Sequence, residues 1–137
     1  MVIEMSEVVV AWVSRHPPLR AQLADLHAKF KVQKIEHISK TFKDANEVCQ
    51  EIRAVNAKVA VVVLPLSMIA RLLETCKDVT FLWAEMQGLH ECNINECKEF
   101  QPDTDVWLPL HGSDKGRHMR FIRFNKIKAI KMELEPL

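Results

Sequence analysis

Three residues with different chemistry, Ser14, Arg15 and His16, stand between a short apolar run, Val8–Val13, and the pair Pro17–Pro18. Such a run is typical of a buried strand whose carboxyl end leads into a helix. Proline suits the first helical turn, where backbone N–H groups have no intrahelical partner. Those N–H donors would bind an anion such as phosphate, together with the hydroxyl of Ser14, the guanidinium of Arg15 and the imidazole of His16. The alternative is structural: the serine caps the helix, the arginine is solvated and the histidine fills a turn.

The following residues alternate between predicted helices and strands. Leu19–Phe30 has apolar residues at intervals of three and four and predicts a helix, and Val32–Ser39 predicts a strand. Asp44 and Glu47 have the spacing of a capping box at the start of a second helix. The β-branched run Val59–Leu64 predicts a central strand covered by helices on both faces.

A third helix and a fourth strand complete this pattern. We expect Ser67 to cap a helix at Met68–Cys76, and Val79–Met86 to form the strand. Three consecutive strand-helix units predict parallel strands joined by crossovers. The sequence therefore predicts an α/β fold, a Rossmann-like and mostly parallel sheet with flanking helices.

The alternation stops after Gln87. Residues 88–116 contain many turn-forming residues and predict an irregular insertion with little regular structure. Residues 117–134 predict two C-terminal strands that meet near Asn125 and form a β-hairpin, although one bent strand is an alternative. The hairpin would extend the sheet or pair with a second subunit. At 137 residues, the chain is expected to be a single domain, 1–137.

The composition restricts the partners and the compartment. A formal net charge of only +1 argues against a broad basic face for duplex DNA or membrane lipids. The acidic N-terminus does not resemble a secretory signal, and no apolar stretch approaches the roughly 20 residues that span a bilayer. We therefore expect a cytoplasmic protein whose four cysteines, Cys49, Cys76, Cys92 and Cys97, are thiols.

Polar groups are expected to gather where the parallel strands end, because open α/β sheets bind ligands at that edge. Besides Ser14, Arg15 and His16, with His37 just before the end of the second strand, the predicted ligand-binding residues are Ser39, Lys40, Pro65, Leu66 and Ser67. Thr41 and residues 85–87 also follow strands. The chain has three glycines and neither a Gly-x-Gly-x-x-Gly fingerprint nor a P-loop. We therefore expect no nucleotide cofactor.

Metal binding is a weaker hypothesis. His90, Cys92 and Cys97 lie close together, with His111 and His118 further along. Zinc requires four ligands, and Cys-x4-Cys is a loose spacing with no second cysteine pair behind it. We therefore expect no metal, with a small zinc protein as the alternative, and no hydrolase nucleophile, since Gly-x-Ser-x-Gly is missing.

The three tryptophans are expected to differ in exposure. Trp12 and Trp83 lie inside predicted strands and are expected in the core. Trp107, beside Pro109 in the predicted insertion, is the better candidate for an exposed contact.

Three short motifs resemble those of a known family: Ser14-Arg15-His16-Pro17, Glu36-His37-Ile38 and Leu64-Pro65-Leu66. The chain resembles the small Rossmann-like CRISPR accessory proteins of type III systems that carry a Ser-Arg-His-Pro signature and are described as ring nucleases. The resemblance covers residues 8–73. It does not extend to the Gly-Ala and Trp that follow the proline in the family, where this chain has Pro18-Leu19-Arg20, or to an Arg-Gly-Arg-like element near the end.

The resemblance implies a ring nuclease that cleaves a cyclic oligoadenylate, with cyclic tetra-adenylate expected, and so switches off type III CRISPR antiviral signalling. The ribose 2′-OH would attack the adjacent phosphorus without a metal and leave a 2′,3′-cyclic phosphate. Arg15 would stabilise the developing charge, and His16 or His37 would transfer a proton. A two-fold ring also suits a homodimer. The alternatives are a module of the same fold that senses or sequesters a nucleotide, and a protein-interaction domain that docks a partner through residues 88–116.

Overall fold

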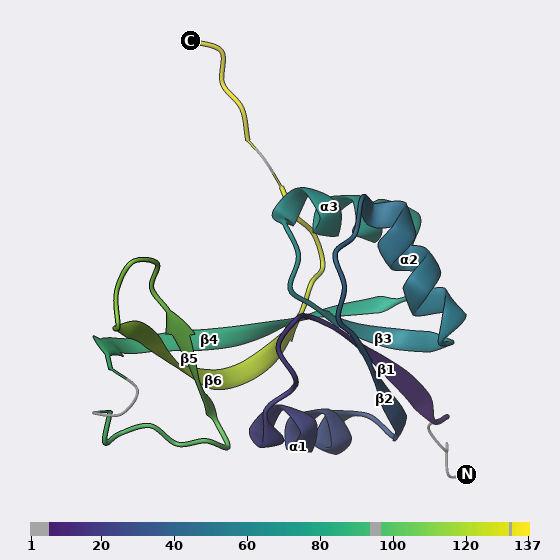
Figure 1. Ribbon diagram of the computed structural model, residues 1–137. Helices are drawn as coiled ribbons and strands as arrows, with labels where there is room; N and C mark the ends of the chain where they lie inside the picture. The colour runs from purple at the N-terminus through teal and green to yellow at the C-terminus, as the bar shows by residue number, and fades with distance from the viewer. Residues whose placement is uncertain (1–5, 94–96, 132) are drawn as a thin grey trace. The chain divides into compact units, whose positions relative to one another are not determined.

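The computed structural model describes residues 6–93, 97–131 and 133–137, which form an α/β fold. It contains a mixed six-stranded sheet with the strand order β2-β1-β3-β4-β6-β5, together with three helices (Figure 1). The contacts group into two compact units, one of residues 6–17, 32–83 and 126–137, the other of residues 18–31 and 84–125. The predicted Rossmann-like class, with parallel strands in the first half, is confirmed.

The first unit contains the parallel strands β1 (Val8–Val13), β2 (Val32–Ile38) and β3 (Ala57–Val62) and the start of β4 (Thr80–Cys92). Val13 lies opposite Ile38 of β2 and Val62 of β3, so the three strands end at the same level. The residues that follow them are therefore brought to one edge of the sheet.

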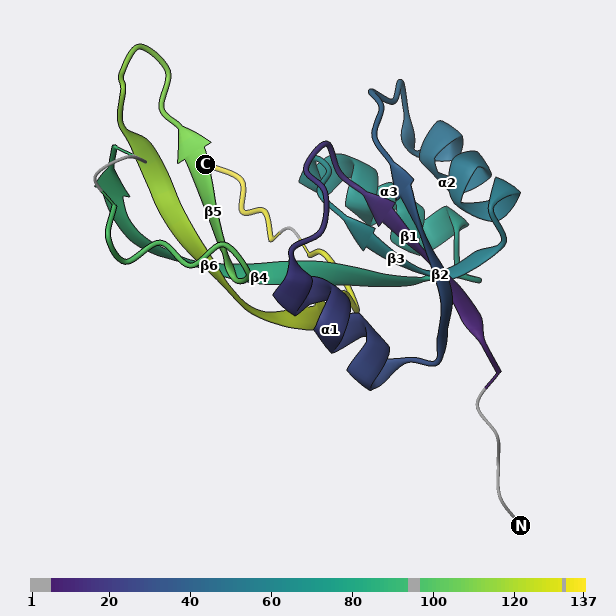
Figure 2. The ribbon, with the colours of Figure 1, turned by 60° about the horizontal axis from the view of Figure 1, so that its bottom comes forward.

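Two helices, α2 (Ala45–Ala54) and α3 (Leu66–Thr75), cover one face of these strands (Figures 1 and 2). Alternate strand residues pack against the apolar sides of both helices and form the core, which includes Val9, Ala11, Val13, Ala60, Val62 and Phe81 with Val48, Ile52, Ile69 and Leu72. This alternation follows from the two-residue period of a strand, which turns every second side chain to the same face.

The helix starts differ partly from their predictions. The N–H of Glu47 donates to Oδ1 of Asp44 at 2.9 Å, as predicted for the start of α2. The helix α3 begins at Leu66 with Pro65 as its N-cap, so the prediction that Ser67 caps it is wrong. The N-cap residue is not yet helical, and the φ of Pro65, −56°, lies in the range to which the proline ring restricts this angle.

The second unit begins with α1 (Arg20–Lys29). Both prolines precede this helix, so the prediction that they occupy its first turn is wrong. Instead, Leu19 is the N-cap, and its N–H donates to Oε1 of Gln22 at 2.8 Å.

The rest of the second unit is the remainder of β4, then β5 (Asp105–Pro109) and the long strand β6 (Gly116–Lys126). Strands β5 and β6 form an antiparallel hairpin, seen most clearly in Figure 2. Residues 88–116 thus include strand structure, and the described residues after 126 include none. The turn-forming residues that suggested an irregular insertion lie largely in the connections on either side of β5.

The state of the cysteines differs from the prediction for one pair. Cys49 of α2 and Cys76, the residue after α3, form a disulfide with a Cα–Cα distance of 6.0 Å, while Cys92 and Cys97 are thiols. Both disulfide partners belong to the core because α2 and α3 pack together, which brings residues distant in sequence within bonding range. Among the described helices, none has the length and apolar character needed to cross a membrane.

The three tryptophans also differ in exposure. Trp12 is buried, as predicted, but Trp83 is 41% exposed, so its prediction as a core residue is wrong. Trp107 is half-buried, and its indole N–H donates to the carbonyl of Cys92 at 2.8 Å. The indole thus has a structural contact inside the second unit.

Candidate functional site

A cavity of about 430 Å³ lies in the first unit at the carboxyl ends of β1, β2 and β3. Its lining combines polar groups that follow β1 and β2 with apolar groups that follow β3: Val13, Ser14, Arg15, His16, Lys40, Thr41, Phe42, Val63, Leu64, Pro65 and Met68. The volume is at the small end of the roughly 300–1,000 Å³ usual for ligand sites.

Arg15 is the most available cation of this cavity. The side chain is exposed, and Nη2 donates to Oγ1 of Thr41 at 2.8 Å. Within the described part of the chain, no carboxylate lies within ion-pair distance of this guanidinium. Its charge and remaining N–H groups are therefore free to bind an anion that enters the cavity.

The backbone that carries Arg15 and His16 is fixed on both sides. Oγ of the buried Ser14 accepts a hydrogen bond from the N–H of His16 at 3.2 Å, and the carbonyl of His16 accepts one from Nε1 of Trp12 at 2.8 Å. Ser14 thus makes a local turn in place of a helix cap. Because Trp12 is anchored in the core, the backbone of His16, a residue that lines the cavity, is held in place.

His37 lies at the same edge but does not line the cavity. Its Nε2 lies 2.7 Å from the carbonyl oxygen of Ser14. A carbonyl oxygen only accepts, so Nε2 must carry the hydrogen, and Nδ1 is the acceptor in the neutral ring. His37 therefore joins the end of β2 to the end of β1, which is a positioning role.

Lys40 is a weaker anion ligand than its place suggests. Its Nζ lies 2.6 Å from Oε1 of Glu51 and 3.6 Å from Oε1 of Glu47, and the hydrogen bond to Glu51 raises the pKa of Lys40. These two carboxylates of α2 offset much of the ammonium charge. The ammonium also lies 5.5 Å from the centre of the Phe42 ring.

The opposite side of the cavity is apolar. Val63, 60% exposed, continues from the end of β3 into Leu64 and Pro65, while Met68 comes from α3 and Phe42 from the segment after β2. An exposed valine beside a cavity leaves apolar surface for a flat ring to cover.

The structure brings together five of the nine predicted site residues: Ser14, Arg15, His16, Lys40 and Pro65. Ser39, Leu66, Ser67 and His37 are exposed and lie outside the lining. The apolar lining residues Phe42, Val63, Leu64 and Met68 were not among the predicted site residues. An apolar residue at the end of a buried strand gives no sequence signal that separates lining from core.

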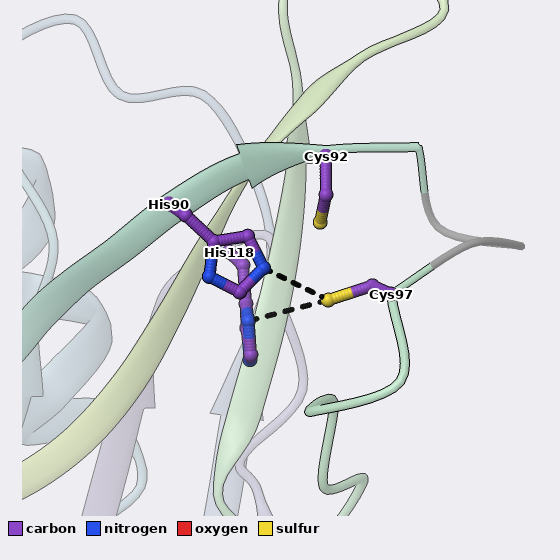
Figure 3. A group of neighbouring side chains, drawn as sticks. All are labelled: His90, Cys92, Cys97 and His118. Carbon is purple, nitrogen blue, oxygen red and sulfur yellow. Dashed lines mark hydrogen bonds between the residues drawn. The ribbon is translucent and has the colours of Figure 1, made fainter.

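A second group of reactive side chains lies in the second unit (Figure 3). His90 and Cys92 come from β4, Cys97 from the loop after it and His118 from β6, and their ligand atoms all lie within 4.8 Å of one another. The exposed His111 is not a member. Two imidazoles and two thiols of this kind are able to hold a metal ion.

Comparison of the chain with models of protein families, with curated proteins and with solved structures yields no match.

Proposed function

We propose that the cavity of the first unit binds a nucleotide portion of a cyclic oligoadenylate and cleaves its phosphodiester, making the protein a metal-independent ring nuclease that ends type III CRISPR signalling. The observation that carries the proposal is the division of the cavity into a cationic side around Arg15 and an apolar side around Val63. A phosphate suits the first side and an adenine ring the second.

Cleavage would begin when the ribose 2′-OH attacks the adjacent phosphorus. The new O2′–P bond forms as the bond from phosphorus to the 5′ oxygen breaks, the 2′-OH gives up a proton and the 5′ oxygen gains one. Arg15 would stabilise the negative charge on the phosphoryl oxygens, and His16 would transfer a proton. His37, bonded to the carbonyl of Ser14, would position this corner rather than react.

The size of the cavity bears on assembly. At about 430 Å³ it suits one nucleotide unit, whereas the ring of cyclic tetra-adenylate has four. Two copies of the chain would bring two such cavities to one ring, and two-fold dimers are the commonest assemblies. The proposed protein is thus a homodimer, which light scattering with and without ligand measures directly, and we propose that it acts in the cytoplasm.

A sensor or sequestering module is the second candidate. Attack by a 2′-OH requires both a base and an acid, and His16 is the one imidazole among the described residues that line the cavity. A site with Arg15 and apolar surface but a single proton-transfer group is well suited to binding the ring intact.

The decisive experiment incubates the full-length protein with cyclic tetra-adenylate, with and without EDTA, and separates the products by chromatography. Linear products ending in a 2′,3′-cyclic phosphate support the nuclease. Removing the proton-transfer group in His16→Ala should slow cleavage by about 10²–10⁴-fold, and Arg15→Ala should reduce binding and cleavage together. Exposed residues outside the cavity provide the matched controls His27→Ala and Arg71→Ala.

The outcomes separate the two candidates. An intact ring that stabilises the protein by about 2.7 kcal/mol at 100 times its dissociation constant supports the sensor. If neither binding nor cleavage depends on Arg15, both candidates are wrong.

A further inference from the structure

The second unit contains a feature that the proposed function does not use, the group of His90, Cys92, Cys97 and His118. We propose that these four side chains form a closed structural zinc site that fastens the end of β4 to the hairpin of β5 and β6. The inference is independent of the cavity in the first unit.

The distances between the side chains are those of a coordination sphere. Nε2 of His90 lies 3.2 Å from Sγ of Cys97, and Nδ1 of His118 lies 3.4 Å from the same sulfur. In a tetrahedral zinc site, bonds of about 2.0–2.3 Å place neighbouring ligand atoms about 3.3–3.8 Å apart. Because all four ligand atoms lie within 4.8 Å of one another, small side-chain rotations suffice to close them around an ion.

Figure 3 shows that the sulfur of Cys97 faces one nitrogen of each imidazole, with Cys92 extending from β4 toward the same space. The two rings are T-shaped, with centroids 4.9 Å apart. Ring nitrogens and sulfurs from three separate segments therefore converge on one point, an arrangement that the spacing of the cysteines alone does not require.

Each histidine also has a carboxylate on its far side. Oδ2 of Asp105 lies 2.6 Å from Nε2 of His118, and Oε2 of Glu99 lies 3.7 Å from Nδ1 of His90. Carboxylates behind ligating imidazoles are usual at metal sites, because they fix the tautomer and turn the other nitrogen to the ion. In this structure Nδ1 of His118 and Nε2 of His90 face Cys97.

The ligand set favours zinc over the other common ions. Two thiolates and two neutral imidazoles suit a tetrahedral ion of intermediate softness, whereas magnesium and calcium require oxygen ligands. The two thiolates also neutralise the charge of Zn²⁺, which matters because His118 is completely buried. With four protein ligands no position is left for substrate, so the role is structural.

The experiment uses the full-length protein, without a polyhistidine tag and purified under reducing conditions. Elemental analysis should find about one zinc per chain, and cobalt substitution should give the visible bands of tetrahedral Co²⁺ with a thiolate charge-transfer band in the near ultraviolet. Cys97→Ser and His90→Gln should each abolish the cobalt spectrum. His111→Gln and the paired Cys49→Ser/Cys76→Ser variant are the controls that should retain it.

A second measurement does not depend on whether variants fold. Wild-type protein stripped by a chelator and titrated with zinc should recover amide hydrogen-exchange protection in β5 and β6 at one equivalent. If the reduced protein takes up neither zinc nor cobalt, the proposal is wrong. It is also wrong if Cys92 and Cys97 form a disulfide and the protein still binds no metal once that disulfide is reduced. Arg15→Ala should bind zinc as the wild type does. A negative result for zinc binding is therefore distinguishable from a negative result for the ring nuclease.

Discussion

Oδ2 of Asp105 lies 2.6 Å from Nε2 of His118, and neither side chain has any exposed surface. Because an ionised carboxylate only accepts, Nε2 carries the hydrogen and Nδ1 of the neutral ring presents its lone pair toward Cys97. Although burial opposes ionisation, four hydrogen-bond donors hold the pKa of Asp105 well below its usual range: Arg120, the Gln101 amide, Thr104 and His118. The interior of the second unit is thus organised around one buried carboxylate.

Asp105→Asn tests this arrangement. Asparagine keeps the size but removes the charge that faces Arg120 and His118. Breaking such a buried pair should lower the free energy of unfolding by about 3 kcal/mol, and the proposed zinc site should lose about 10–100-fold in affinity. Urea denaturation and competition with a chromophoric chelator measure the two effects. The exposed Asp114→Asn in the same hairpin is the control; equal behaviour of the two variants would contradict the role of Asp105.

Glu51→Gln should strengthen anion binding in the first unit. Oε1 of Glu51 lies 2.6 Å from Nζ of Lys40, which lines the cavity, so removing the carboxylate charge leaves more of the ammonium charge for a ligand. Exposed ion pairs are weak, so the expected gain in affinity is about two- to five-fold. Titration calorimetry with cyclic tetra-adenylate or an adenylate dinucleotide measures it, with Glu74→Gln on α3 as the control. Weaker binding in Glu51→Gln would show that Lys40 does not face the ligand.

The disulfide between Cys49 and Cys76 should stabilise the first unit. It closes a loop with a sequence separation of 27 residues, for which the chain-entropy relation gives about 3.5 kcal/mol. Oxidised and reduced protein compared by thermal denaturation should show the difference. Thiol titration in denaturant, with a chelator present, should detect Cys92 and Cys97 before reduction and all four cysteines after it. Four reactive thiols in protein purified without reductant would contradict the disulfide.

The alternation of elements was predictable from the sequence because the central strands β1 and β3 are short apolar runs, and α2 and α3 have strongly amphipathic patterns. The segment after Gln87 was not readable in the same way. Strand β5 has only five residues, Asp105–Pro109, and its neighbouring turns dominated the pattern. Its pairing with β6 is specified by tertiary contacts, such as that of Trp107 opposite His118. Such contacts cannot be predicted from the local strand propensity of the residues.

The cavity was predictable in outline, because the topology of parallel strands places their carboxyl ends together. Arg15 and His16 were found for this reason. The sequence could not show which side chains form ion pairs with the cations of the cavity. Glu51 lies eleven residues from Lys40 and reaches it only because α2 packs beside the end of β2. Likewise, His118 is 21 residues from Cys97, so the four-residue group is visible only in the folded hairpin.

The ion pair of Arg53 and Asp78 gives a pH-dependent prediction. A hydrogen bond from Arg53 at 2.8 Å is the main cause that lowers the pKa of Asp78. The folded protein therefore binds this proton less readily than the unfolded chain. The pair contributes its full stability above the unfolded pKa of about 3.9 and loses it as the pH falls through the lower, folded value. NMR titration of the Asp78 carboxyl should give a midpoint below that of the unfolded chain, and Arg53→Ala should move it upward; an unchanged midpoint would contradict the pairing.

Gly116→Ala and Gly88→Ala form a matched pair, since each places a methyl group on a strand of the second unit. A Cβ at Gly88 meets no atom within 4 Å, whereas a Cβ at Gly116 would overlap the indole of Trp107. That indole donates to the carbonyl of Cys92 at 2.8 Å, so displacing it disturbs the backbone that carries a proposed zinc ligand. Overpacking should cost Gly116→Ala about 1–3 kcal/mol in unfolding free energy, together with a weaker cobalt spectrum.

Gly88→Ala should be neutral or slightly stabilising, because alanine restricts the unfolded chain more than glycine does. Chemical denaturation and cobalt titration of both variants separate a local effect at Trp107 from a general intolerance of side chains in these strands. If Gly116→Ala kept full stability, the indole would be free to move, and its hydrogen bond could not be what fixes the end of β4. If Gly116→Ala lost stability but kept the wild-type cobalt spectrum, the substitution would strain the hairpin without affecting the proposed zinc ligands, and Trp107 would not be linked to them.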